Sequence, residues 1–110
     1  MHKNLRLVYI TIQSKDEASK IGRGIIEQNL AACVNIIPGM TSYYRWEGQV
    51  QSDEETVLLV KTHTSKLKDV TDYVKEVHSY ECPCVISLTL AEGEGNEEYL
   101  NWLLSESKNL

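Results

Sequence analysis

An α+β fold is predicted for this chain, with an antiparallel sheet that carries helices on one face. The first observation is the order of apolar patterns: strand, helix, strand, strand, helix, strand and a short C-terminal helix. The second is a long, protruding β-hairpin in residues 30–61, where a turn at residues 47–49 joins two strand-like runs. Together these features match the split βαβ, or ferredoxin-like, arrangement.

The composition predicts one globular domain, residues 1–110, that folds without a disulfide or a bound metal. A chain of 110 residues buries roughly two-thirds of the surface that it exposes when unfolded, which is enough for a core. Its hydrophobic fraction of 42% and charged fraction of 25% are those of a globular protein. No apolar run approaches the ~20 residues of a membrane-spanning helix, and we see no apolar leader at the N-terminus.

The net charge and the cysteine content indicate which partners and which cellular compartment to expect. The formal net charge is -5 and the basic residues are scattered, whereas phosphate contacts need clustered Lys and Arg. Nucleic acid is therefore not an expected partner. The three cysteines show no pairing pattern, which indicates a reducing compartment. We expect a cytoplasmic protein in which Cys33 is a small buried residue.

The chain begins with a predicted strand and a capped helix. Residues 5–13 are apolar on both faces, as in a central strand. A capping box follows, in which the Ser14 hydroxyl accepts from the Glu17 amide and the Glu17 carboxylate reaches back to the Ser14 amide. The helix runs to about Asn29, and Gly22 would let it approach the sheet closely. Its buried stripe is expected to be Ala18, Ile21, Ile25 and Ile26.

The second half of the chain supplies two more helices and a strand. Thr64 or Ser65 is expected to cap a helix that ends near His78. Pro83 opens a strand over residues 84–90, where a proline need not donate to the ladder. The apolar faces are Leu67, Val70, Val74 and Val77 in this helix, and Tyr99, Leu100, Leu103 and Leu104 in a C-terminal helix capped by Asn96.

The hairpin is longer than the first helix is able to cover. An arm of about 14 residues spans about 45 Å, whereas a helix of about 15 residues spans about 22 Å. The overhanging tip would expose apolar surface of the kind found at interfaces. We therefore expect a homo-oligomer in which the tip packs on a neighbouring copy, with a bulge at Pro38-Gly39 directing it outward. The expected contact residues are Met40, Tyr43, Tyr44 and Trp46, and the alternative is that they pack on their own core.

The segment from His78 to Cys84 holds the side chains best suited to a metal. Imidazole and thiolate are ligands for Cu(I) and Zn(II). Cys82 and Cys84 would share one side of a strand, and His78 lies at the helix end just before them. We therefore predict a metal site of His78, Cys82 and Cys84. The structural alternative is that His78 interacts with the C-terminal dipole of its helix and the cysteines are small strand residues.

A family resemblance covers essentially the whole chain. The run L-A-A-C-V-N-I-I-P-G-M-T-S-Y-Y-R-W-E-G, residues 30–48, is similar to the signature of the CutA divalent-cation-tolerance family. The segments 57–62, 78–81 and 99–103 fall where that family carries like segments. The resemblance implies a ferredoxin-like subunit in a tight homotrimer whose hairpins form intersubunit sheet. It also implies a link to copper and other divalent cations and, in animals, to the anchoring or trafficking of acetylcholinesterase.

The resemblance bears on the metal site as well. Metal-linked bacterial relatives implicate a histidine at this helix end, which His78 matches, and a cysteine in the first strand, where this chain has residues 9–12 without a thiol. The family run after the histidine is P-Y-E-x-P-E. In this chain Ser79 replaces the first Pro of that run and Cys84 replaces its final Glu. A metal site here would therefore have a thiol where the family has a carboxylate.

These observations predict a trimeric protein that binds copper or another divalent cation in metal tolerance, without needing the metal to fold. One alternative is a scaffold that recruits a protein partner. Another is a small-ligand sensor, because the implied trimer is similar in shape to the PII signalling trimers, which bind ligands between subunits. An enzyme is not expected, because the chain carries no phosphate loop, nucleophile elbow or H-E-x-x-H pattern.

Overall fold

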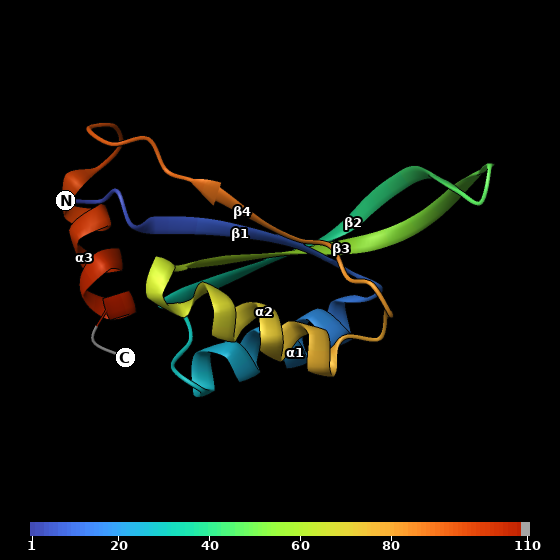
Figure 1. Ribbon diagram of the computed structural model, residues 1–110, viewed down its shortest axis with the longest axis horizontal. Coiled ribbons are helices and arrows are strands. Elements are labelled where there is room, and N and C mark those ends of the chain that lie inside the picture. The colour runs from blue at the N-terminus through green and yellow to red at the C-terminus, as the bar shows by residue number, and fades with distance from the viewer. Residues whose placement is uncertain (109–110) are drawn as a thin grey trace.

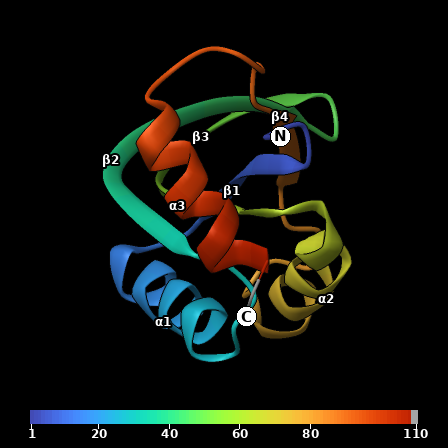
Figure 2. The ribbon, with the colours of Figure 1, turned by 90° about the vertical axis from the view of Figure 1, so that its left-hand side faces the viewer.

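The computed structural model describes residues 1–108 as a mixed α+β fold with a four-stranded antiparallel sheet in the order β2-β3-β1-β4. Helices α1 and α2 lie side by side on one face of the sheet, and α3 lies across the end of the sheet that is remote from the hairpin tip (Figures 1 and 2). The predicted element order is confirmed. The elements are β1 (Leu5–Ile12), α1 (Lys15–Glu27), β2 (Cys33–Trp46), β3 (Gln49–His63), a 3-10 turn (Thr64–Lys66), α2 (Leu67–Val77), β4 (Val85–Thr89) and α3 (Glu97–Lys108).

The core lies between the sheet and the two helices α1 and α2. Alternate residues of β1 and β3 face these helices because side chains on a strand alternate between its faces. Gly22 is buried, and a Cβ there would lie 3.1 Å from Leu58 Cδ1 and 3.2 Å from Val34 Cγ2, so the expected close approach is confirmed. The core consists of Val8, Ile10, Ile12, Ala18, Ile21, Ile25, Ala31, Leu58, Val60, Val70 and Val74.

The buried stripe of α1 is narrower than expected. Ala18, Ile21 and Ile25 are buried, but Ile26 is 37% exposed, so its prediction as a core residue is wrong. Successive residues on a helix point about 100° apart. With Ile25 fully buried, Ile26 is turned toward the edge of the contact between helix and sheet.

The helix caps differ from the predictions in two places. Ser14 Oγ accepts from the Glu17 amide at 3.2 Å, as expected. The Glu17 carboxylate, however, accepts from the amide and hydroxyl of Ser79, both at 2.8 Å, and so ties the start of α1 to the loop after α2. The cap before α2 is His63, whose Nδ1 accepts from the Ser65 amide at 3.1 Å. The predicted caps, Thr64 and Ser65, lie inside the 3-10 turn instead. The predicted cap of α3 is confirmed, since Asn96 Oδ1 accepts from the Glu98 amide.

The hairpin extends well beyond the helices (Figure 1). Its strands have 14 and 15 residues, whereas α1 has 13. The ladder shifts register between Ile37 and Met40, and Gly39 has φ 82°, which confirms the bulge at Pro38-Gly39. The extra residue of the bulge changes which β2 positions share a face: odd-numbered positions face away from the helices before it, and even-numbered positions do so after it.

We call the face of the sheet opposite α1 and α2 the open face. In β4, Ile86 pairs with Tyr9 and Leu88 pairs with Leu7, and directly paired residues share a face. Ile86 is 50% exposed and Leu88 is 46% exposed in the single chain. At one end of this face α3 contacts β3, where Lys61 Nζ donates to the Tyr99 hydroxyl at 3.1 Å. The open face comprises Leu7, Tyr9, Thr11, Ile37, Val57, Leu59, Ile86 and Leu88.

Candidate functional site

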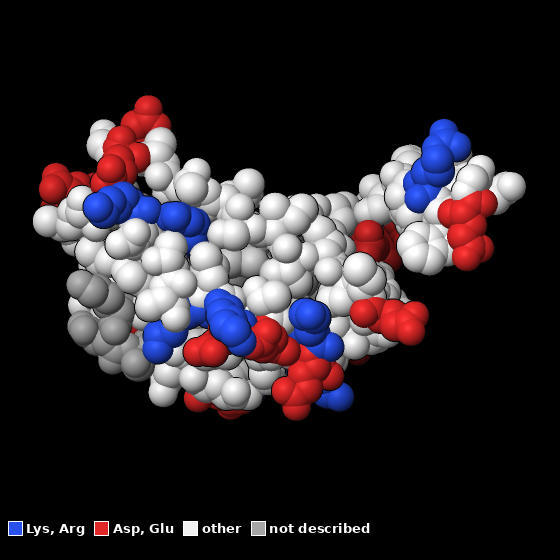
Figure 3. Space-filling view, viewed as in Figure 1, with Lys and Arg blue, Asp and Glu red and all other residues white. Residues whose placement is uncertain are grey.

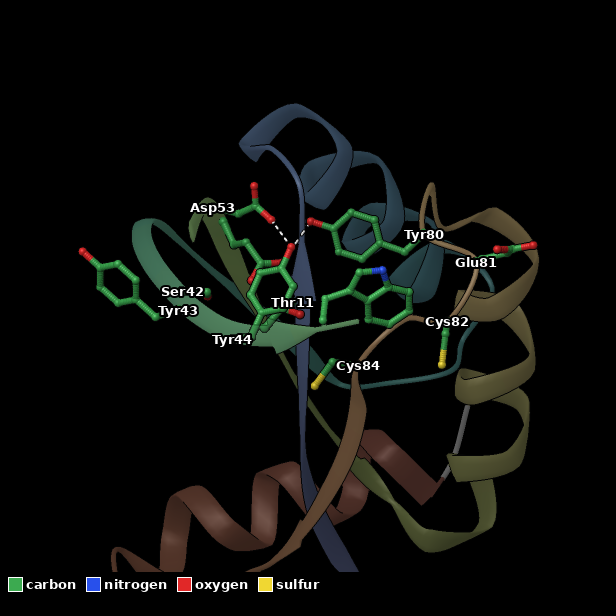
Figure 4. Close-up of a pocket in the computed structure, with 11 residues that line it drawn as sticks. Thr11, Ser42, Tyr43, Tyr44, Asp53, Tyr80, Glu81, Cys82 and Cys84 are labelled. Atoms are coloured by element: carbon green, nitrogen blue, oxygen red, sulfur yellow. Dashed lines mark hydrogen bonds between the residues drawn. The ribbon is translucent and has the colours of Figure 1, made fainter. Parts of the chain in front are cut away.

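A pocket of about 700 Å³ lies where the hairpin leaves the body of the molecule. It is bordered by the hairpin, the end of β1 and the loop between α2 and β4 (Figure 4). Its volume lies within the range of small-molecule sites, about 300–1,000 Å³. We call it the hairpin pocket; its lining residues are Thr11, Ser42, Tyr43, Tyr44, Trp46, Asp53, Glu55, Tyr80, Glu81, Cys82 and Cys84.

The register of the hairpin explains why polar groups converge there. Ser42 pairs with Asp53 and Met40 with Glu55, so these four residues share the face that continues the open face. Asp53 and Glu55 are two residues apart on β3 and therefore point to the same side. The bulge at Pro38-Gly39 thus brings the even-numbered residues of the β2 tip, Tyr44 among them, onto the same face as the two carboxylates.

Two tyrosines donate hydrogen bonds to these carboxylates, and Figure 4 shows Tyr44 beside Asp53. The Tyr44 hydroxyl donates to Asp53 Oδ2, and the Tyr80 hydroxyl donates to Glu55 Oε2 at 2.9 Å. The bond to Asp53 is the main cause that raises the pKa of Tyr44. Burial, followed by the bond to Glu55, raises the pKa of Tyr80. Both hydroxyls therefore remain protonated donors at neutral pH.

The pocket carries negative charge. Asp53, Glu55 and Glu81 line it, and no Lys, Arg or His from residues 1–108 does so. Figure 3 shows acidic side chains where the hairpin leaves the body of the molecule. Such a pocket concentrates cations and repels anions.

Replacing Tyr80 by Phe is expected to make the protein less sensitive to alkaline pH. The pKa of Tyr80 is raised in the folded state, whereas an unfolded tyrosine titrates near its usual pKa of about 10. As the pH rises above about 10, the unfolded chain releases a proton that the folded chain retains, so the free energy of unfolding falls. Urea unfolding between about pH 8 and about pH 11 should therefore show a steeper decline for the wild type than for Tyr80→Phe. Parallel declines would contradict the assignment.

His78 holds in place the loop between α2 and β4, which contributes Tyr80, Glu81, Cys82 and Cys84 to the pocket. Its side chain is buried, and Nε2 lies 2.9 Å from the Thr11 carbonyl oxygen. The Tyr80 amide donates to Nδ1 at 3.0 Å, so Nδ1 is the acceptor and Nε2 carries the hydrogen that is donated to Thr11. A metal needs a lone pair of the imidazole, and in this arrangement both ring nitrogens are engaged. Glu17 supports the same loop, with Oε2 at 3.8 Å from Nδ1.

The cysteines of the predicted metal site lie at the pocket rather than in a strand. Cys82 is exposed and Cys84 is half-buried, and both precede β4, which begins at Val85. Pro83 thus also lies before the strand that it was expected to open. Both cysteines line the hairpin pocket, whereas Cys33 is half-buried on β2 rather than buried.

No three His, Cys, Asp or Glu side chains within residues 1–108 form a group that could hold a metal ion. The structure therefore brings Cys82 and Cys84 to one pocket, but it does not join them with His78 in a three-ligand site. The pocket contains two soft sulfur donors beside hard carboxylate oxygens. The sulfur donors suit a thiophilic cation.

The predicted contact residues at the hairpin tip differ in exposure. Tyr43 is 75% and Trp46 is 61% exposed, and Tyr44 is partly exposed beside its carboxylate partner. Met40 instead packs within the chain, where its sulfur accepts from the Tyr9 hydroxyl at 3.4 Å.

Sequence reasoning missed two groups of the pocket, Asp53 with Glu55 and Tyr80. In the sequence the two acids belong to the acidic run of residues 53–55, and Tyr80 falls within the family segment of residues 78–81. The available signal was their alternation: Asp53 and Glu55 flank Glu54, whose carboxylate points to the other face and accepts from Thr41 at 2.8 Å. Nothing in the local sequence indicates that Tyr80 meets Glu55, because 25 residues separate them.

These features define a class: a small α+β domain with an uncovered sheet face, a protruding hairpin and an acidic, thiol-bearing pocket. A match to the CutA1 divalent ion tolerance protein family covers residues 6–106. The chain belongs to this family, as the resemblance of its hairpin sequence predicted. The family is named for divalent-ion tolerance and not for an enzymatic reaction.

Relatives and solved structures agree with this assignment. The divalent-cation tolerance protein CutA of Thermus thermophilus is 47% identical over 97 residues, which cover 88% of this chain and 92% of that protein. The chloroplastic protein CutA of Arabidopsis thaliana is 42% identical over 94% of this chain, but the match spans only 56% of that protein. The crystal structure of CutA1 from Oryza sativa superposes with a TM-score of 0.88 at 42% identity and covers 94% of each chain.

The names of the relatives indicate different compartments. Those from plants are called chloroplastic, and the structure from Archaeoglobus fulgidus is called a periplasmic protein. In the part of the chain that the structure describes, every helix is too short or too polar to cross a membrane.

Proposed function

We propose that this protein acts in divalent-cation tolerance by binding the metal itself, with copper as the preferred ion and the thiols of Cys82 and Cys84 as its ligands. The observation that supports this is that both cysteines line one acidic pocket. Thiolates are soft ligands that select Cu(I), and the carboxylates of the pocket would raise the local concentration of the cation. His78 holds the loop of these ligands in place through Thr11 and Tyr80.

We further propose that the subunit has the ferredoxin-like fold and works as a homotrimer in the cytoplasm. The open face supports the assembly, because Ile86 and Leu88 of β4 leave about half of their surface exposed in a single chain. An uncovered sheet face of this kind is normally buried against another layer. The three free cysteines favour a reducing compartment.

A scaffold that binds another protein is the second candidate. The observation that favours it is the strong exposure of Tyr43 and Trp46 at the hairpin tip. Aromatic side chains are enriched at protein interfaces, and a partner bound at the tip would need neither the cysteines nor a metal.

Replacing Cys82 and Cys84 by Ser is expected to weaken Cu(I) binding by at least about a hundredfold, because changes outside the ligand shell alone cost up to about that much. Tag-free protein would be titrated with Cu(I) under anaerobic conditions against a competing chromophoric chelator. Cys33→Ser is the matched control: it removes the third thiol, which lies outside the hairpin pocket, and should bind as the wild type does. Equal affinities of wild type and Cys82→Ser/Cys84→Ser would contradict the proposed ligands.

A further inference from the structure

We propose that the hairpin pocket also binds a small organic cation, a primary amine with an apolar body, whose ammonium group is held by Asp53 and Glu55. This site differs from the copper ligands proposed above and does not depend on them. The pocket combines three properties that such a ligand requires: sufficient volume, unbalanced negative charge and aromatic walls.

The two carboxylates are arranged to receive a donor. Each is held in place by one tyrosine, since Tyr44 donates to Asp53 Oδ2 and Tyr80 donates to Glu55 Oε2. Within the described chain, the second oxygen of each carboxylate takes no further hydrogen bond and forms no ion pair. An ammonium group has three N–H donors, so it is able to bond to both carboxylates, which project from the same side of β3.

The walls of the pocket favour an apolar body on the ligand. Trp46, Tyr44 and Tyr80 contribute aromatic rings to the lining. Aromatic faces attract a cation within about 6 Å, and Trp does so most strongly. They also shield the aliphatic or aromatic part of an amine from water. The carboxylates therefore bind the ammonium group of such an amine, and the aromatic rings pack against its apolar body.

The same geometry disfavours a bare divalent ion at the carboxylates. A hard metal such as Ca²⁺ takes six to eight oxygen ligands converging on one point. No group of three or more acidic, His or Cys side chains within residues 1–108 converges in that way. Each carboxylate has already committed one oxygen to a neutral hydroxyl. An amine needs only one free oxygen from each.

Trp46 supplies a direct readout of binding. The chain has two tryptophans, and Trp102 lies on α3 against Tyr99, with ring centroids 5.6 Å apart. In the Trp102→Phe background, fluorescence excited in the tryptophan band therefore reports on Trp46 and hence on the pocket.

The experiment titrates Trp102→Phe protein with phenethylamine, with the neutral isostere 2-phenylethanol and with methylamine, which lacks the apolar body. We expect a saturable change in Trp46 emission with phenethylamine. Binding should be at least about tenfold weaker for 2-phenylethanol, since an ammonium–carboxylate hydrogen bond contributes about a tenfold factor or more. It should be at least about tenfold weaker for methylamine as well, since that compound has no apolar body to bury against the aromatic rings. These comparisons use a folded protein with an intact pocket. Equal binding of the amine and the alcohol would overturn the proposal.

Matched variants then locate the site. Asp53→Asn with Glu55→Gln keeps acceptors for the tyrosine hydroxyls but removes both charges, and should weaken phenethylamine by at least about tenfold. Glu54→Gln removes one carboxylate charge from the same strand, but its side chain faces Thr41 on the other face, and it should leave binding unchanged. Equal losses in both would show only a general charge effect and overturn the site.

A competing occupant is a basic side chain from a second copy in the assembled protein, such as the exposed Arg45 of another hairpin tip. In that case phenethylamine would produce no saturable signal in the wild-type assembly, and an Arg45→Ala variant would acquire one. That outcome would also overturn the proposal. Cu(I) titration of the Cys82→Ser/Cys84→Ser variant tests the copper proposal separately, because that variant keeps Asp53 and Glu55.

Discussion

Replacing Ile25 by Ala is expected to lower the free energy of unfolding by about 2–5 kcal/mol. The Ile25 side chain is fully buried between α1 and the sheet, in the core cluster that includes Ile10 and Leu58. Truncation removes apolar contacts and leaves a cavity, because the close approach of α1 at Gly22 limits how far the helix is able to shift. Urea unfolding at one fixed chain concentration measures the loss, since assembly makes stability concentration-dependent.

Ile26→Ala is the matched control on the same helix. It deletes the same atoms from a side chain that is 37% exposed, so the loss should be clearly smaller than at Ile25. Nearly equal losses of unfolding free energy for the two variants would mean that α1 is rotated about its axis, so that Ile26 also faces the sheet. The pair thus tests the one position where the apolar pattern of this helix was misleading.

The patterns of the chain predicted the order of the elements because each pattern has a local cause. Runs of apolar residues mark the strands, Ser14 and Asn96 bond to nearby amides, and the Pro38-Gly39 break corresponds to a bulge with a left-handed glycine. The excess length of the hairpin also followed from residue counts alone. All of these depend on residues within a few positions of one another.

Features that depend on distant partners were not predictable in this way. The Glu17 carboxylate has two choices, the Ser14 amide nearby and the Ser79 groups 62 residues away, and only the fold brings Ser79 within reach. The same holds for His78. Its residue type suggests a metal ligand, but the Thr11 carbonyl, 67 residues away, occupies one nitrogen. The sequence therefore indicated the two cysteines of the pocket but not its carboxylates. The carboxylates stand out only in the fold, where Tyr44 and Tyr80 donate hydrogen bonds to them.

Introducing charge on the open face, with Ile86→Lys and Leu88→Lys together, is expected to convert the proposed trimer into single chains. Both side chains are about half exposed in the isolated subunit, so a lysine there remains solvated and the subunit stays folded. In an assembly that covers this face, each unpaired ammonium group would be buried at a cost of several kcal/mol. Two such groups in every subunit outweigh the apolar contacts that the two residues contribute.

Sedimentation equilibrium distinguishes the two states, because the wild type should have the mass of three 12.5-kDa chains and the variant that of one. Val77→Lys is the control: Val77 is 41% exposed, but it lies on α2, on the opposite side of the sheet. It adds one lysine to a comparably exposed apolar site and should leave the mass unchanged. A wild type that sediments as one chain would exclude the trimer, and a charged variant that retains the wild-type mass would place the interface elsewhere, at the hairpin tip. Because the two surfaces lie at different parts of the sheet, the mass of this one variant decides whether the open face or the aromatic tip holds the assembly together.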